Sequence, residues 1–247
     1  MDGGAFPTLI AIISMFFVGV SGGAFDSMLS ALLLTLFIVL GVCMTFAVSK
    51  VLSMTVLKGI PSSFTLELPP YRRPQIGKVI VRSIFDRTLF VLGRAIAVAA
   101  PAGLLIWIMA NVQLDGITLL AHFSGFLDPF ARLLGMDGVI LMAFILGLPA
   151  NEIVIPIIIM AYMAQGSLLE FDSLAQLRDL LVNNGWTWIT AVSTMLFSLM
   201  HWPCTTTLLT IRKESGSLKW TVMSFLVPTV CAVVLCFAFA TVARMFV

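Results

Sequence analysis

The sequence predicts an all-α polytopic membrane protein with about five transmembrane helices plus a re-entrant hairpin of two half-helices. Of its 247 residues, 60% are hydrophobic and only 11% are charged, whereas about 25% of the residues in an ordinary soluble domain are charged. The apolar residues form runs that approach the roughly 20 residues a helix needs to cross a bilayer. Two runs are interrupted near their centres by proline and polar residues, which predicts helices that break at membrane depth.

The first 49 residues contain the first two predicted transmembrane helices. An apolar run over residues 6–20 ends at a Ser-Gly-Gly turn, and a second run over residues 28–48 ends before Lys50. At about 1.5 Å per residue, both runs approach the ~30 Å thickness of the hydrocarbon core.

Residues 50–88 are predicted to form a cytoplasmic loop. The segment 50–87 holds seven basic residues and two acidic ones, and an excess of Lys and Arg is typical of cytoplasmic loops. Three prolines within residues 69–74 exclude a regular helix at its centre. Residues 75–87 place their isoleucine and valine side chains near one face, which indicates an amphipathic helix on the membrane surface.

A third transmembrane helix is expected at residues 89–109, and an external loop at residues 111–137. The loop carries three aspartates and one arginine, so it lacks the basic excess of a cytoplasmic loop. Its apolar stretch 119–134 is predicted to be interrupted by Gly125 and Pro129. We therefore expect surface or re-entrant helices there rather than a further span.

The next apolar run, residues 138–164, is predicted to be the re-entrant hairpin. Its centre reads GLPANE at residues 147–152. If this run crossed the membrane once, the later basic pair Arg212 and Lys213 would lie outside, against the usual distribution of positive charge. A hairpin with residues 149–152 at its tip keeps that pair in the cytoplasm.

The remaining chain adds a short helix, a second broken run and a last span. Residues 173–182 have the pattern of a short helix, which ends at Asn-Asn-Gly. The run 186–211 is broken by HWPC at residues 201–204. Residues 220–243 form the last predicted transmembrane helix.

The two breaks are the candidate ion path. Non-helical backbone at membrane depth costs several kcal/mol per unsatisfied group unless it lines a wet cavity or is buried in protein. One break offers Asn151 and Glu152, and the other offers His201 and Cys204 at i, i+3 spacing. Carboxylate, imidazole and thiolate together suit Fe²⁺, Mn²⁺ or Zn²⁺. Paired broken segments are typical of midplane binding sites in transporters.

Each candidate residue also has a simpler interpretation. Glu152 can cap the second half-helix, His201 can be a hydrogen-bonded packing histidine, and Cys204 can be inert. Pro149 and Pro203 are candidate gating positions, because proline interrupts the helical hydrogen-bond ladder. Weak sulfur contacts to the ion are possible from two methionines that otherwise fill the core, Met160 and Met200.

Other function classes are disfavoured by composition and motifs. The net charge is only +2 and no basic stripe is interleaved with aromatic residues, so we expect no binding of nucleic acid. The chain has no GxxxxGK[ST], GxGxxG or HExxH motif. We therefore expect no enzyme activity in this chain. Any nucleotide hydrolysis is expected in another chain or domain.

Four motifs resemble the membrane portion of the ferrous iron transport protein B family. They are FTLELPPYR at residues 64–72, GLPANEIVIP at 147–156, HWPCTTTL at 201–208 and KESGSLKW at 213–220. The resemblance covers essentially the whole chain. It implies a multi-pass protein of the prokaryotic inner membrane that imports Fe²⁺ as a substrate and holds no permanent cofactor.

The resemblance also implies an ion-path role for Cys204, with His201, Asn151 and Glu152 beside it. It identifies residues 1–49 as the remnant after a first gate repeat, and residues 89–247 as a second gate repeat with C-terminal helices. Members of the family begin with a GTPase domain and a first gate repeat. We therefore expect GTP to act only through a partner chain or a missing domain. The expected partners are membrane lipid and either a GTPase/first-gate half or further copies of the chain.

Two other functions remain open on the sequence. A gate-domain transporter of nucleosides or another organic solute would need a roomier polar cavity and no metal. A non-transporting membrane assembly subunit would use its broken helices only to pack against a partner.

Overall fold

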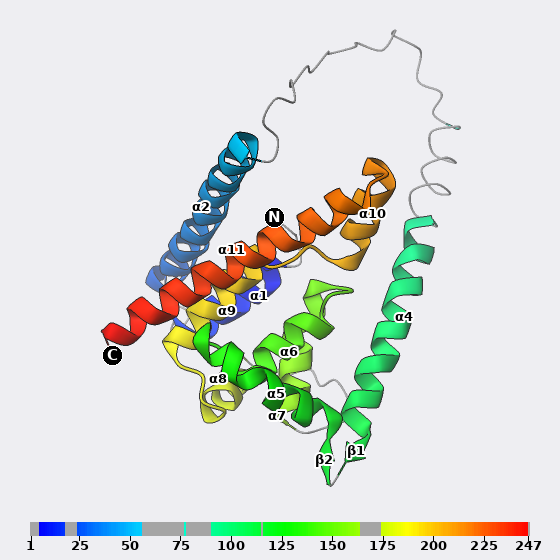
Figure 1. Ribbon diagram of the computed structural model, residues 1–247. Coiled ribbons are helices and arrows are strands. Elements are labelled where there is room, and N and C mark those ends of the chain that lie inside the picture. Colours follow the sequence, from blue (N-terminus) through cyan, green and yellow to red (C-terminus); the bar gives the residue numbers. More distant parts are fainter. Residues whose placement is uncertain are drawn as a thin grey trace.

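The computed structural model describes residues 5–17, 24–55, 77, 90–114, 116–163 and 174–246, and these are mostly helical (Figure 1). Apart from residue 77, the predicted amphipathic helix at 75–87 lies outside these residues, and of the predicted loop at 50–88 only residues 50–55 and 77 are described.

Two helices in the described part of the chain are long and apolar enough to cross a membrane. They belong to α2 (Ala24–Thr55) and α11 (Leu218–Met245). Within the ranges that the structure describes, the count rises to three if α5 (Leu119–Leu133) and α6 (Gly138–Leu146), which are bent by 109° to each other, are taken as one span. The described residues are mostly helical and include helices of membrane-spanning length and composition, and the expected number of about five spans is not confirmed.

The helix α1 (Ala5–Phe16) is part of the core. Leu9, Ile12 and Ile13 are completely buried, and the helix lies against α9 (Trp188–Met200). Its twelve residues extend about 18 Å, which is shorter than the ~30 Å hydrocarbon core. The end of the predicted span at 6–20 lies outside the described residues.

The stretch after α4 (Phe90–Asn111) differs from its prediction in two ways. A small antiparallel hairpin of β1 (Gln113–Leu114) and β2 (Ile117–Thr118) precedes α5, and no sequence pattern predicted it. In addition, α5 continues unbroken through Gly125 and Pro129. Thr118 caps the start of α5 by accepting a hydrogen bond from the Ala121 N–H at 3.3 Å.

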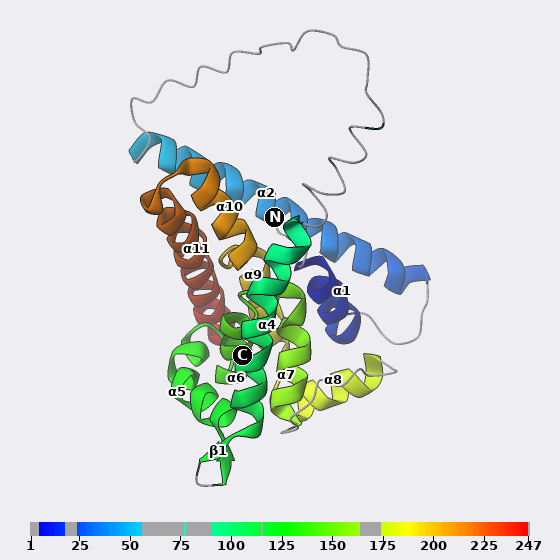
Figure 2. The same ribbon diagram turned by 90° about the vertical axis from the view of Figure 1, so that its right-hand side faces the viewer.

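The run predicted to be the re-entrant hairpin forms two helical segments separated by a turn. The first half-helix is α6, and the second is the 3₁₀ turn η2 (Asn151–Ile153) followed by α7 (Val154–Tyr162). The Tyr162 hydroxyl at the end of α7 donates to the side chain of Asp137, which caps the start of α6. The two half-helices are therefore antiparallel and lie side by side (Figure 2).

The base of the hairpin is tied to its neighbours. The Trp186 indole N–H, just before α9, donates to the Tyr162 hydroxyl at 2.8 Å. At the start of α6, a Cβ on Gly138 would lie 1.9 Å from the Ser124 carbonyl oxygen of α5. The absence of a side chain at residue 138 allows α5 and α6 to pack this closely.

The second broken run is also observed. It consists of α9 and α10 (Thr205–Ser215), with His201 and Cys204 in extended backbone between them. Pro203 disfavours helical geometry at Trp202, the residue before it, and α9 ends two residues earlier, at Met200. The predicted short helix at 173–182 is α8 (Leu174–Asn183).

Candidate functional site

The two breaks contact each other through one carbonyl group. The Leu148 carbonyl oxygen accepts a hydrogen bond from the Thr205 backbone N–H at 2.9 Å and another from the Thr205 hydroxyl at 3.2 Å. Leu148 follows α6, and Thr205 is the first residue of α10. A helix start has N–H groups without partners in the helix itself. The Leu148 carbonyl of one break therefore provides a hydrogen-bond partner for the first backbone N–H after the other break.

The first break is a tight turn that places its two polar residues on different sides. Ala150 N–H donates to the Gly147 carbonyl oxygen at 3.0 Å, which closes the turn around Pro149. Asn151 is buried at 7% exposure, whereas the adjacent Glu152 is exposed. A carboxylate and an amide that are neighbours in the sequence thus face different surroundings.

His201 in the second break has the surroundings of a packing histidine. It is buried, and its Nδ1 donates to the Ser198 carbonyl oxygen at 2.9 Å. Its ring centroid lies 5.2 Å from that of Phe144, 6.0 Å from that of Phe197 and 5.9 Å from that of Trp202. These surroundings are those of a hydrogen-bonded packing histidine, the simpler of the two interpretations.

Cys204 has more polar and more open surroundings. Its side chain is half-buried at the start of α10. The sulfur lies 3.0 Å from the Thr206 hydroxyl oxygen and 3.1 Å from the Thr207 hydroxyl oxygen. One soft sulfur ligand is thereby grouped with two oxygen atoms at the end of the break.

The candidate residues do not converge on one preformed metal site. Within the described ranges, no group of three or more His, Cys, Asp or Glu side chains is placed to hold a metal ion. Met160 is buried in α7, and Met200 is half-buried at the end of α9. The geometry brings together the breaks themselves rather than a set of ligands.

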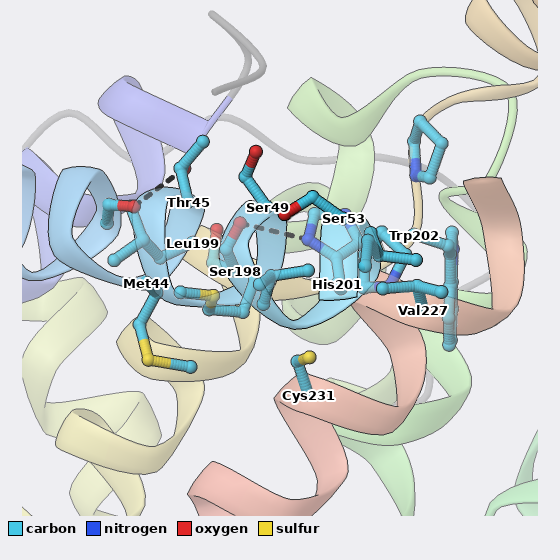
Figure 3. A pocket seen from close by; sticks show the side chains of 16 residues that line it. Met44, Thr45, Ser49, Ser53, Ser198, Leu199, His201, Trp202, Val227 and Cys231 are labelled. Atoms are coloured by element: carbon cyan, nitrogen blue, oxygen red, sulfur yellow. Dashed lines mark hydrogen bonds between the residues drawn. The ribbon is translucent and has the colours of Figure 1, made fainter. Parts of the chain in front are cut away.

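A cavity of about 480 Å³ lies beside the second break (Figure 3). Its walls are α2, the segment from Ser198 to Pro203, and the part of α11 around Pro228. Sequence reasoning missed the contribution of α2, which presents three hydroxyl side chains to the cavity, those of Thr45, Ser49 and Ser53. Their spacing of four residues places them on one helix face and was the available signal.

Two family models match the sequence. The model described as "Nucleoside recognition", named Gate, matches residues 92–218, just over half of the chain. The model described as "Ferrous iron transport protein B C terminus" matches residues 34–86.

Curated relatives are similar over most of the chain. Proteins named "Fe(2+) transporter FeoB" include one from Staphylococcus aureus strain MSSA476, 31% identical over 85% of this chain and 31% of the relative. One from Campylobacter jejuni is 25% identical over 83% of this chain and 35% of the relative. A third, from Synechocystis, is 30% identical over 78% of this chain and 31% of the relative. No solved structure matches.

The chain therefore spans about a third of the length of these relatives. Along the chain, the iron-transport model matches first, at residues 34–86, and the Gate model follows at residues 92–218. On these matches, the chain belongs to the Gate family and corresponds to the C-terminal membrane portion of the ferrous iron transport protein B family.

Proposed function

We propose that this chain forms the permease portion of a ferrous iron importer, with the ion path at the breaks Pro149–Glu152 and His201–Cys204. The observation that carries the proposal is the shared Leu148 carbonyl, which joins two breaks 57 residues apart. Because α6–α7 and α9–α10 meet there, a shift of either pair of half-helices changes the contact. Paired broken helices that meet in this way suit a gate.

In this proposal Fe²⁺ is a transported substrate. Cys204 supplies a soft ligand on the path, and Asn151 lines it from the first break. His201 holds the second break in shape through its bond to Ser198, and Pro149 and Pro203 are the pivots. Weak, sequential contacts favour movement of an ion over its retention.

The positions of the basic residues support a cytoplasmic location for one end of the molecule. The end of α2, the end of α10 and the start of α11 lie at one end of the molecule, opposite β1, β2 and α5 (Figures 1 and 2). These segments bring Lys50, Arg212, Lys213 and Lys219 to that end. An excess of positive charge is typical of the cytoplasmic side, so we place this end inside the cell.

A GTPase and a first gate repeat, in another chain or another segment, are proposed to complete the transporter. The relatives are about three times as long as this chain. This leaves room in them for the parts that the resemblance implies.

Transport of a nucleoside or another organic solute is the second candidate. The matching Gate model is described as "Nucleoside recognition", and a cavity of about 480 Å³ lies within the size range of small-molecule sites. The assembly-subunit alternative has no such observation in its favour.

Uptake assays separate these functions. Proteoliposomes that hold the chain alone, or the chain with a GTPase/first-gate half, are tested anaerobically with radioactive Fe²⁺ and with radioactive nucleosides. We expect Fe²⁺ uptake by the pair, with no nucleoside uptake. Uptake of nucleosides without Fe²⁺ would replace the proposal with the second candidate, and uptake of neither by an assembled pair would favour the assembly subunit.

A further inference from the structure

The cavity beside the second break has a neutral lining with polar groups on several walls. Among the described residues that line it, none is Asp, Glu, Lys or Arg. Figure 3 shows side chains of α2 on one side, the segment of Ser198 and His201 on another, and Cys231 of α11 below. An occupant of this cavity is therefore selected by hydrogen bonding and ligand softness rather than by net charge.

Two of the three hydroxyl groups on α2, those of Thr45 and Ser53, are arranged as acceptors. The Thr45 hydroxyl donates its hydrogen to the Gly41 carbonyl oxygen at 2.8 Å, and the Ser53 hydroxyl donates to the Lys50 carbonyl oxygen at 3.0 Å. A hydroxyl has one hydrogen and two acceptor lone pairs. With the hydrogen used inside the helix, each oxygen offers acceptor capacity to the cavity.

All three walls carry further acceptors, and these are soft. Met44, Met200 and Cys231 bring three sulfur atoms to the lining, and sulfur ligands favour late first-row divalent ions over Mg²⁺. The Nδ1 hydrogen of His201, which also lines the cavity, is used on the Ser198 carbonyl. These oxygen and sulfur acceptors, which lie within an otherwise largely apolar lining, suit a cation that keeps much of its water shell.

We propose that this cavity is the cytoplasmic passage of the transported divalent cation, lined by the hydroxyl row of Thr45, Ser49 and Ser53 and by Cys231. The inference rests on the proposed function and adds the route between the second break and the cell interior. The row runs along α2 toward its end at Thr55, at the basic end of the molecule. A lining without acidic groups holds the ion weakly, as release requires.

Site-directed labelling of the completed transporter in proteoliposomes tests this passage. Ser49→Cys and Ser53→Cys are treated with a charged, membrane-impermeant methanethiosulfonate, and peptide mass spectrometry reads each cysteine separately. Phe46→Cys is the matched control, because Phe46 is on the same helix, 72% exposed and outside the cavity lining. We expect residues 49 and 53 to react at least about tenfold faster, because a thiolate forms in water and not in lipid.

Protection by ions identifies the occupant. Mn²⁺, used as a redox-stable probe, is expected to slow labelling at residues 49 and 53, and Mg²⁺ at the same concentration is not. Labelling as slow as at residue 46 would show a lipid-filled groove and overturn the passage. Protection by nucleosides alone would also overturn it, and would assign the cavity to an organic solute.

Measurement of Fe²⁺ uptake distinguishes failure of the proposed passage from failure of the proposed transport function. Labelling without Mn²⁺ protection, in a transporter that takes up Fe²⁺, would overturn the passage and leave the proposed function standing. Absence of Fe²⁺ uptake by the unlabelled transporter would overturn the proposed function itself.

Discussion

Substitution of Cys204 by serine is expected to reduce Fe²⁺ uptake by the completed transporter at least about tenfold, the equivalent of ~1.4 kcal/mol. Serine keeps the size of the side chain and its hydrogen bonding with the neighbouring threonine hydroxyls, which lie 3.0 and 3.1 Å from the sulfur. Only the soft ligand is removed. The loss is therefore expected in uptake and not in the amount of folded protein.

Cys43→Ser is the matched control for this prediction. Cys43 is an exposed cysteine on α2 and lies outside the cavity lining, so its replacement is expected to leave uptake unchanged. Initial rates of radioactive Fe²⁺ uptake, normalised to folded protein, provide the measurement. Full uptake by Cys204→Ser would contradict an ion-path role for this sulfur.

Substitution of Gly138 by alanine is expected to have the largest effect on stability. The new Cβ would lie 1.9 Å from the Ser124 carbonyl oxygen and 2.9 Å from the Asp128 backbone nitrogen. Neither atom is the end of a flexible side chain, so α5 and α6 must separate. We expect a loss of more than about 2 kcal/mol, at the upper end of the range for overpacking, seen as a lower thermal unfolding midpoint in detergent.

Gly125→Ala is the matched control. It tests whether the loss of stability in Gly138→Ala comes from the close contact at residue 138 or from replacement of any glycine in these helices. Gly125 lies within α5, and a Cβ there would meet no atom within 4 Å. Because alanine favours helix over glycine by up to ~1 kcal/mol, we expect an unchanged or slightly higher midpoint. Equal destabilisation by the two substitutions would contradict the close contact between α5 and α6.

The interruptions of the helices could be predicted from the sequence because they are local. Proline and polar residues within apolar runs predicted the hairpin of α6 and α7 and the break between α9 and α10. A helical pattern followed by Asn-Asn-Gly likewise predicted α8. Each of these features depends on residues adjacent in the chain.

The same local reasoning failed where contacts between distant parts of the chain determine the structure. Pro129 predicted an interruption, yet α5 continues through it, since tertiary contacts can override local propensity. The bond between Leu148 and Thr205 joins residues 57 apart and has no sequence signal. The opposite burial of Asn151 and Glu152 depends on the turn geometry of the break, which residue type alone does not set.

The central claim is that the two breaks form one gate, and a reversible lock between them tests it most directly. Leu148→Cys and Thr205→Cys are combined, since the Thr205 backbone nitrogen lies 2.9 Å from the Leu148 carbonyl oxygen and the two main chains are in contact there. The fraction of cross-linked protein is measured first, because a disulfide forms only at specific separations of the two residues. Fe²⁺ uptake by the completed transporter is measured before oxidation, after oxidation and after reduction. The account predicts uptake that is lost on oxidation and restored on reduction. Unchanged uptake with the disulfide fully formed would show that the breaks do not move against each other during transport.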